Sequence, residues 1–327
     1  MMIREIEKDI YSIYVPLKGN PLRALNSYYI RGDESDLLID TGFRRDSCRE
    51  ALEEALAELG SEKARRRVLC THLHSDHSGM ADLFAGDDQP IYMSRPDLDL
   101  FRYFAGGVAR ASTRERFLKE AFPEDMLMEV YGTNPASTQS MPGVDPRLTE
   151  VDDGQEICVG DYRLQAVLVP GHTPGNCMFW EASKQIMFTG DHVLFDITPN
   201  ITNWIVMDDS LGAYLDSLEK AKTFLVRLAL PGHRETGNYH ERIEALQKHH
   251  AARLAEQERI IKEYPGQTAY DLAGRMQWKI RARNWAEFPV IQKWFAVGEC
   301  MAHLDYLVKR GHVIREDAGD FMRYYPA

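Results

Sequence analysis

The residues that decide the fold are Val-Leu-Cys-Thr-His-Leu-His-Ser-Asp-His-Ser-Gly, numbers 68–79. The apolar run Val68–Thr71 predicts a buried strand, because it is short, rich in β-branched and aliphatic residues, and followed by polar residues. The segment after it places three histidines and one aspartate within six residues. Imidazole nitrogens and carboxylate oxygens are the donors that catalytic zinc ions take in proteins. The stretch therefore predicts a metal site at the end of a strand.

The spacing within this segment divides its donors into two pairs. His72 and His74 are separated by one residue, so a short loop can point both rings into one pocket. Asp76 and His77 lie at the start of a helix that we expect to run through Phe84, and they face a second point. The sequence thus predicts two neighbouring groups of metal ligands.

Three later segments have the same character, and each follows a predicted strand. They are Pro-Gly-His-Thr-Pro-Gly at 170–175, Thr-Gly-Asp-His at 189–192 and Pro-Gly-His at 231–233. In layered α/β folds such loops gather along one sheet edge, so that residues distant in sequence meet in space. The candidate ligands in these loops are His172, Asp191 and His233. The neighbouring glycines (Gly79, Gly171, Gly175, Gly190 and Gly232) allow the backbone to approach a metal closely.

Each piece alone also has an ordinary explanation. A histidine in a Pro-Gly turn is commonly an exposed loop residue, Asp191 after Thr-Gly fits a helix cap, and His72 with His74 fits two surface histidines. Four such segments at strand ends, in this order, do not fit coincidence. His192, beside Asp191, is interpreted as a hydrogen-bonded loop residue and is left out of the site.

Composition limits the class of protein. The 327 residues are 44% hydrophobic and 27% charged, with a net charge of −11, which excludes disordered, fibrous and disulfide-stapled chains. This acidity disfavours a nucleic-acid or anionic-membrane partner, whose binding relies on basic patches. The five scattered cysteines predict reduced thiols in a cytoplasmic protein, and no apolar run has the length of a membrane span.

Strand and helix signals alternate along the first 240 residues. We expect helices over about 45–59 and 214–222, and strands at 10–15, 27–30, 37–39, 162–169, 185–189 and 224–230. Such a mixture predicts a layered α/β catalytic domain over residues 1–240.

Residues 95–150 interrupt this pattern with a helical insertion that ends in a Pro-, Gly-, Ser- and Thr-rich loop. Insertions of this length often serve as lids or binding loops, and a passive surface elaboration is the alternative. Phe101, Tyr103 and Phe104 either line an acyl pocket or belong to the core.

Residues 241–327 predict a separate C-terminal unit. A long polar helix to Tyr264 is followed by a helix capped by Thr268, a third helix over about 290–310, and a hairpin at the chain end. Helices followed by a hairpin predict a winged-helix-like arrangement.

The pattern resembles the metallo-β-lactamase-fold superfamily of hydrolases, whose signature is HxHxDH followed by a distal His, a bridging Asp and a last His. The resemblance covers roughly residues 1–240 and implies a four-layer αββα sandwich with two metals at one sheet edge. It implies one set of ligands for the first metal, another for the second, and one shared residue. They are His72, His74 and His172 for the first, Asp76, His77 and His233 for the second, and Asp191 as the bridge. The C-terminal unit is similar to the tail of the branch that includes β-lactamase-like protein 2.

The complete ligand set implies a dinuclear hydrolase that uses a metal-bridging hydroxide. Zn²⁺ suits these donors, and Fe or Mn are alternatives. Asp76 is the candidate to orient the nucleophile and take its proton, with a pure ligand role as the alternative. Glu replaces His74 in flavodiiron oxygen reductases, so this pattern does not predict a redox di-iron site.

The substrate is less well determined than the metal site. The resemblance to the thioesterase and lactonase branches, such as hydroxyacylglutathione hydrolase, favours a small acyl substrate: a thioester, lactone or ester. The alternative is a phosphodiesterase or endoribonuclease, to which the basic and aromatic residues between Arg275 and Trp285 would contribute. These residues also fit coenzyme A phosphates, or a solvated helix face with two buried tryptophans. A homodimer through the tail or the insertion remains open.

Overall fold

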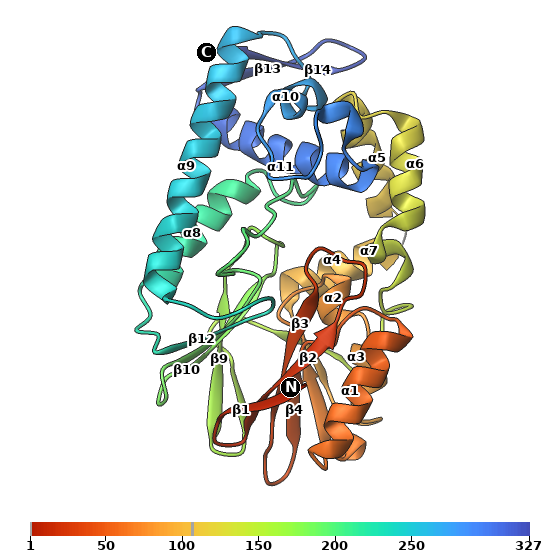
Figure 1. Cartoon of the computed structure of the whole chain (residues 1–327), viewed down its shortest axis with the longest axis vertical. Helices are drawn as coiled ribbons and strands as arrows, with labels where there is room; N and C mark the ends of the chain where they lie inside the picture. Colours follow the sequence, from red (N-terminus) through yellow and green to blue (C-terminus); the bar gives the residue numbers. More distant parts are fainter. Residues whose placement is uncertain (1, 106–107) are drawn as a thin grey trace.

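The computed structural model describes residues 2–105 and 108–327 and contains two facing β-sheets (Figure 1). The first sheet has the strand order β1 to β7, and the second has the order β12-β11-β10-β9-β8. The strands of the first sheet are β1 (Ile3–Glu7), β2 (Ile10–Pro16), β3 (Ala24–Ile30), β4 (Asp36–Ile39), β5 (Arg66–Leu69), β6 (Ile91–Ser94) and β7 (Leu148–Val151). Those of the second sheet are β8 (Glu156–Val159), β9 (Tyr162–Leu168), β10 (Cys177–Glu181), β11 (Ile186–Gly190) and β12 (Leu228–Pro231).

Side chains alternate across each strand, so each sheet has one face toward the other sheet and one toward helices. On β3, Tyr28 and Ile30 pack against Phe179 and Phe188 of the second sheet. Tyr29, between them in sequence, joins the core on the outer face of the first sheet. This alternation is why the two sheets stack as a sandwich.

Helices cover both outer faces. The first sheet packs against α1 (Asp46–Glu58), α3 (Ala81–Phe84) and α4 (Arg95–Ala105). The second sheet packs against α8 (Ser210–Lys222) and the first half of α9 (Tyr239–Glu263). The four-layer αββα arrangement expected from the sequence is confirmed.

Four further helices form a separate cluster above the sandwich (Figure 1). They are α5 (Val108–Lys119), α6 (Glu124–Thr133), α10 (Ala269–Arg275) and α11 (Val290–Lys309), with the hairpin β13 (Val313–Asp317) and β14 (Met322–Pro326). The short helix α7 (Pro135–Thr138) lies beside α2 (Ser75–Ser78) at the sandwich. Phe117, Phe122 and Leu127 of the insertion share one apolar core with Val297 and Leu304 of α11. The insertion and the C-terminal helices therefore stabilise each other.

Three local expectations differ from the structure. The helix expected through Phe84 divides into α2 (Ser75–Ser78) and α3, because the backbone leaves the helical conformation at Met80, whose N–H donates to Thr41 Oγ1 at 3.2 Å. The insertion does contain the expected loop, over 139–147, but its last residues form β7, which pairs in parallel with β6. The strand expected from Phe224 begins only at Leu228.

The C-terminal elements largely match the sequence prediction. Thr268 forms a capping box with Asp271, and a hairpin closes the chain. Helix α9 crosses residue 240, and the domain division at that residue stays a prediction, as does the winged-helix comparison. No helix within the described ranges combines the length and apolar character needed to cross a membrane.

Candidate metal centre

All seven predicted ligands lie close together at one edge of the sandwich, just after the ends of strands from both sheets. His72 and His74 follow β5, Asp76 and His77 lie in α2, and the other three follow strands of the second sheet. Their donor atoms form three groups, each with all atoms within 4.8 Å of one another. The groups are His72, His74 and His172; His72, His77 and Asp191; and Asp76, His77 and His233.

The first group, His72, His74 and His172, turns its imidazole nitrogens toward one another, and one of these nitrogens has no hydrogen-bond partner among the described residues. His172 donates from Nδ1 to the carbonyl oxygen of Asn200 at 2.9 Å, which leaves a lone pair on its buried Nε2 without a partner. His72 Nδ1 contacts Thr71 Oγ1 at 3.1 Å, and that hydroxyl already donates to Asp40. His72 therefore carries its proton on Nδ1 and points a bare Nε2 toward His74 Nδ1, 3.0 Å away.

The group of Asp76, His77 and His233, called the second group from here on, has a close contact between two ring nitrogens. His77 Nδ1 donates to Asp40 and His233 Nδ1 donates to the carbonyl oxygen of Ala24, each at 2.7 Å. Both rings therefore turn Nε2 inward, where the two Nε2 atoms are 3.3 Å apart. Asp76 Oδ2 lies 3.3 Å from His233 Nε2. Two facing lone pairs at this distance require a proton or a cation between them.

Asp191 lies between the two groups. Its Oδ1 is 3.4 Å from His77 Nε2, and its Oδ2 is 3.5 Å from His233 Nε2 and 3.8 Å from His172 Nε2. Oδ1 is buried without a hydrogen-bond partner among the described residues. Converging imidazole nitrogens and an unsatisfied carboxylate oxygen are the donor set of a divalent cation site, so the residues present fit the metals that the sequence implies.

Two glycines make this close approach possible. A Cβ on Gly232 would lie 2.6 Å from Asp191 Oδ1 and 2.8 Å from the His77 ring. Gly190 adopts a positive φ of 48° and would place a Cβ against Thr71. A side chain at either position would push the ligand loops apart.

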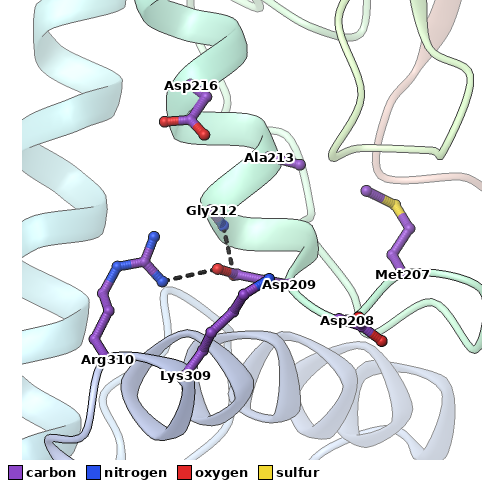
Figure 2. Close-up of a pocket in the computed structure, with 8 residues that line it drawn as sticks. All are labelled: Met207, Asp208, Asp209, Gly212, Ala213, Asp216, Lys309 and Arg310. Atoms are coloured by element: carbon purple, nitrogen blue, oxygen red, sulfur yellow. Dashed lines mark hydrogen bonds and ion pairs between the residues drawn. The ribbon is translucent and has the colours of Figure 1, made fainter.

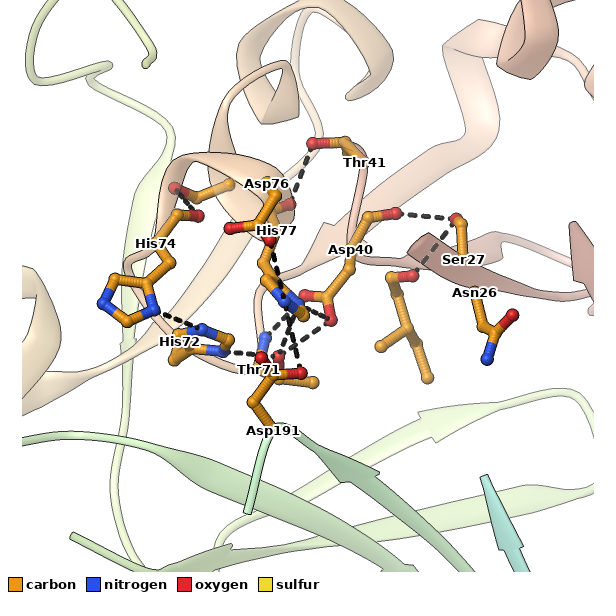
Figure 3. A network of polar contacts seen from close by, with 12 residues as sticks. Asn26, Ser27, Asp40, Thr41, Thr71, His72, His74, Asp76, His77 and Asp191 are labelled. Atoms are coloured by element: carbon orange, nitrogen blue, oxygen red, sulfur yellow. Dashed lines mark hydrogen bonds and ion pairs between the residues drawn. The ribbon is translucent and has the colours of Figure 1, made fainter. Parts of the chain in front are cut away.

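Asp40 orients the ligands and was not predicted from the sequence. Its Oδ1 accepts the Thr71 backbone N–H at 2.8 Å, and its Oδ2 accepts from Thr71 Oγ1 and His77 Nδ1 (Figure 3). The residue has a φ of 59°, a backbone conformation that a non-glycine residue adopts at a cost. Asp40 thereby fixes the His77 tautomer and ring orientation. The signal available in the sequence was its place directly after the apolar strand Leu37–Ile39.

Asp97 is a second residue that sequence reasoning missed. Its buried carboxylate accepts the Leu73 backbone N–H at 2.8 Å, the Thr173 hydroxyl at 2.8 Å and the Gly175 backbone N–H at 2.6 Å. Burial raises its pKa to about 6, although these three hydrogen bonds oppose the shift. Asp97 ties the loop that carries His72 to the loop that carries His172.

Burial and the local charges set the protonation of the ligands. Burial lowers the pKa of His74 to about 3. Burial alone would also lower the pKa of His77, but Asp40, Asp191 and Asp76 outweigh it and raise that pKa well above its usual range. The pKa of Asp76 is lowered to about 2 because His77 and His233 outweigh the effect of burial. The site thus favours ionised carboxylates at Asp76 and Asp191, and these carboxylates favour the protonated forms of His77 and His233.

These shifts predict that zinc binding releases protons. His77 and His233 have raised pKa values, and a metal must displace their protons, so apparent zinc affinity rises with pH and falls in acid. At pH 7 we expect release of about one proton per chain or more. Isothermal titration calorimetry in buffers of different ionisation enthalpy measures this number. A binding enthalpy that is independent of the buffer would contradict the assignment.

Trp204 packs beside the first group. Its indole Nε1 donates to the carbonyl oxygen of His172 at 3.0 Å, and its ring stacks on His74 with centroids 5.9 Å apart. The preceding Asn200 donates its side-chain amide to Glu299 of α11 at 3.3 Å. The loop around the first group is therefore anchored to the C-terminal helices.

The three aromatic residues proposed for an acyl pocket differ in how deeply they are buried. Phe101 packs against the core outside the first sheet, whereas Tyr103 is exposed and Phe104 is half-buried.

A surface pocket of about 430 Å³ lies at the start of α8, near the end of α11 (Figure 2). None of the seven ligands lines it, and its Asp209 caps α8 and pairs with Arg310. That pocket is separate from the metal centre.

The Arg275 to Trp285 segment is largely tied to its surroundings. Trp278 and Trp285 are half-buried against the C-terminal core, and Arg275 lies over the Tyr264 ring at 3.9 Å. Arg283 forms an ion pair with Glu287 at 3.1 Å. These contacts favour the interpretation of a solvated face with packed tryptophans over a nucleic-acid surface.

Comparison with known proteins agrees with this geometry. Residues 21–233 match the metallo-beta-lactamase superfamily, and residues 286–327 match a metallo-beta-lactamase-like C-terminal domain. The human acyl-coenzyme A thioesterase MBLAC2 is 29% identical over 220 residues, which cover 64% of this chain and 73% of that protein. A beta-lactamase-like protein 2 homolog of Caenorhabditis elegans is 24% identical, with 85% and 82% of the two chains covered.

Solved structures extend the similarity to nearly the whole chain. A metallo-beta-lactamase family protein from Thermus thermophilus superposes with a TM-score of 0.83 and 26% identity, covering 99% of this chain and 100% of that chain. A beta-lactamase domain protein from Burkholderia ambifaria gives a TM-score of 0.86 and 25% identity, covering 99% and 94%. With its sandwich, its ligand loops and these matches, the chain belongs to the metallo-β-lactamase superfamily.

Proposed function

We propose that this protein is a dinuclear metal-dependent hydrolase whose substrates are small acyl thioesters. The observation that carries the proposal is the pair of ligand groups with Asp191 between them, in which the buried Nε2 of His172 and Oδ1 of Asp191 have no hydrogen-bond partner among the described residues. The substrate class rests on the relatives, which include the human acyl-coenzyme A thioesterase and an atrochrysone carboxyl ACP thioesterase of Aspergillus fumigatus. The Aspergillus protein is 28% identical, and the match spans 54% of its length.

The proposed ligand roles follow the two groups. His72, His74 and His172 would hold one cation, whereas Asp76, His77 and His233 would hold the other, with Asp191 shared. Bound divalent cations would supply a Lewis acid for the thioester carbonyl and a water of lowered pKa. The nitrogen and oxygen donors favour Zn²⁺, with Fe or Mn as alternatives.

The protein's own residues prepare the reaction around these atoms. Asp76 is ionised, since its pKa is about 2, and its Oδ2 lies next to His233 Nε2. We assign Asp76 the role of orienting the attacking water and accepting its proton. Trp204, half-buried and stacked on His74, forms an apolar surface for the acyl chain on the other side of the centre.

Release of free thiol from an acyl-coenzyme A ester tests this proposal. Zinc-loaded protein should contain about two metals per chain and release thiol, and protein stripped with a chelator should not. Metal content that stays near one per chain after reconstitution would contradict the dinuclear centre. Loaded protein that releases no thiol from short- or long-chain esters would contradict the substrate class.

The proposal leaves three features as predictions. They are a cytoplasmic location, a homodimer and a lid function for the insertion. The alternative function, a phosphodiesterase or endoribonuclease, is disfavoured by the net charge of −11 and by the packed tryptophans of the Arg275 to Trp285 segment.

A further inference from the structure

Four cationic side chains belong to one small region next to the second ligand group. Lys18 and Arg23 lie in the loop 17–23, which connects β2 to β3 and is closed by a hydrogen bond from the Leu17 backbone N–H to the Arg23 carbonyl oxygen. The residue after this loop, Ala24, supplies the carbonyl oxygen that holds His233. The loop therefore ends one residue from a contact with a proposed metal ligand.

Two further arginines pack onto the same loop from other parts of the chain. Arg45 Nη1 donates to the Lys18 carbonyl oxygen at 2.8 Å, and Arg234 Nη2 donates to the Pro21 carbonyl oxygen at 2.6 Å. Arg234 directly follows His233 in sequence. We call Lys18, Arg23, Arg45 and Arg234 the basic rim.

The charge of the basic rim is not balanced by neighbouring acids. Within the described part of the chain, no carboxylate lies within 4.0 Å of these four cationic groups, whereas the adjacent Arg44 pairs with Asp82 at 2.7 Å. Lys18 and Arg23 are exposed, and their side chains make no hydrogen bond to another described residue. In a protein of net charge −11, such a region attracts anions locally.

The basic rim and Trp204 lie beside different ligand groups. The rim adjoins the group of Asp76, His77 and His233 through Ala24 and Arg234, whereas Trp204 contacts His74 and His172. A thioester placed across the centre with its acyl chain at Trp204 would therefore have its thiol portion on the side of the loop 17–23. The thiol portion of coenzyme A carries a diphosphate and a 3′-phosphate, which arginine and lysine bind well.

We propose that the basic rim binds the phosphates of coenzyme A and thereby makes the site selective for coenzyme A thioesters. This inference rests on the proposed thioesterase function. An acidic carrier protein is the less favourable thiol partner, because the rim is small and the rest of the surface repels a large anion. Helix α10, which leads into the Arg275 to Trp285 segment, lies at the far end of the molecule from the sheets (Figure 1).

The test compares one acyl group on two thiols, coenzyme A and the phosphate-free N-acetylcysteamine. In the double variant Lys18→Gln/Arg23→Gln, we expect the ratio of kcat/KM values for the two esters to fall about tenfold, mainly through KM for the coenzyme A ester. Glutamine keeps most of the side-chain length. Arg23 has a positive φ of 72°, and glutamine adopts this conformation as well as arginine does because both residues carry a Cβ. The matched control is Lys279→Gln/Arg281→Gln, which removes two exposed cations from the rival segment and should leave the ratio as in the wild type.

Calorimetry with free coenzyme A gives a readout that does not depend on hydrolysis. The rim variant should bind coenzyme A about tenfold more weakly, with a weaker dependence on salt, and the control variant should bind like the wild type. An unchanged ratio and affinity in the rim variant would overturn the proposal, as would a loss confined to the control variant. A loss of activity confined to an acyl carrier protein ester would overturn it in favour of a protein partner.

The same data separate this inference from the proposed function. If the wild type hydrolyses neither ester, yet the rim variant loses coenzyme A affinity, the thioesterase function is wrong and the rim is supported. If the wild type hydrolyses both esters with equal kcat/KM, the thioesterase function stands and the rim proposal is wrong.

Discussion

Asp191→Ala is expected to remove most of the activity and part of the metal. Asp191 is the residue whose two oxygens face both ligand groups, at 3.4 to 3.8 Å from His77, His172 and His233. Loss of a residue that only supports a ligand already costs about 10- to 100-fold in affinity or activity, so loss of this residue should cost at least about 100-fold in kcat/KM. Elemental analysis should show metal content falling from about two to about one per chain or less.

The matched control for this substitution is Asp196→Ala, in the same loop and exposed. It should keep both the metal content and the turnover of the wild type. Circular dichroism of both variants checks that the fold survives. Wild-type turnover together with wild-type metal content in Asp191→Ala would remove Asp191 from the site.

Asp40→Asn is expected to weaken the second ligand group specifically. Asp40 accepts three hydrogen bonds, from the Thr71 backbone N–H, the Thr71 hydroxyl and His77 Nδ1. An amide at this position presents one N–H₂ group to these donors. If that group faces His77, the imidazole must move its proton to Nε2, the atom that points into the metal centre. We expect a 10- to 100-fold loss of affinity for one of the two metals, in line with other residues that orient ligands.

Competition with a chromophoric chelator measures the two affinities separately. Asp36→Asn is the control, because Asp36 is buried like Asp40 and begins the strand that Asp40 follows. Its carboxylate accepts the Gly32 backbone N–H and contacts Arg65, and it touches none of the ligands. An equal loss of affinity in both variants would mean that Asp40 acts only through general stability.

Much of the site could be predicted because its ligands lie in short motifs at strand ends. His72, His74, Asp76 and His77 are nearly contiguous, and the loops of His172, Asp191 and His233 each combine glycine with a metal-binding side chain. The strand periodicity that precedes each motif places it at a sheet edge. The structure brings these residues together, and the local pattern was sufficient to find them.

Residues that act on the ligands could not be found in this way. Asp40 reaches Thr71 and His77 because β4 and β5 pair in parallel, with Ile39 opposite Leu69. Asp97 reaches two loops because α4 follows β6 beside them. A single sequence without strand pairing gives no indication of such contacts, since each depends on register between distant segments.

The same reason applies to the basic rim and to the C-terminal unit. Arg45 and Arg234 are far apart in sequence and meet only because both pack on the loop 17–23. The shared core of Phe117 and Phe122 with Leu304 likewise joins two segments that sequence patterns treat as separate. The break of the predicted helix at Met80 depends on a distant residue too, because the Met80 backbone N–H donates to the Thr41 hydroxyl and not to a helix carbonyl.

The most direct test of the account is a substrate panel with zinc-loaded protein and the Asp191→Ala variant as blank. The panel contains an acyl-coenzyme A thioester, a lactone, a simple ester, a phosphodiester and a short RNA. The account predicts metal-dependent cleavage with the highest kcat/KM for the thioester and no cleavage of the phosphodiester or RNA. Preferred cleavage of the phosphodiester or RNA, or of the lactone over the thioester, would contradict it.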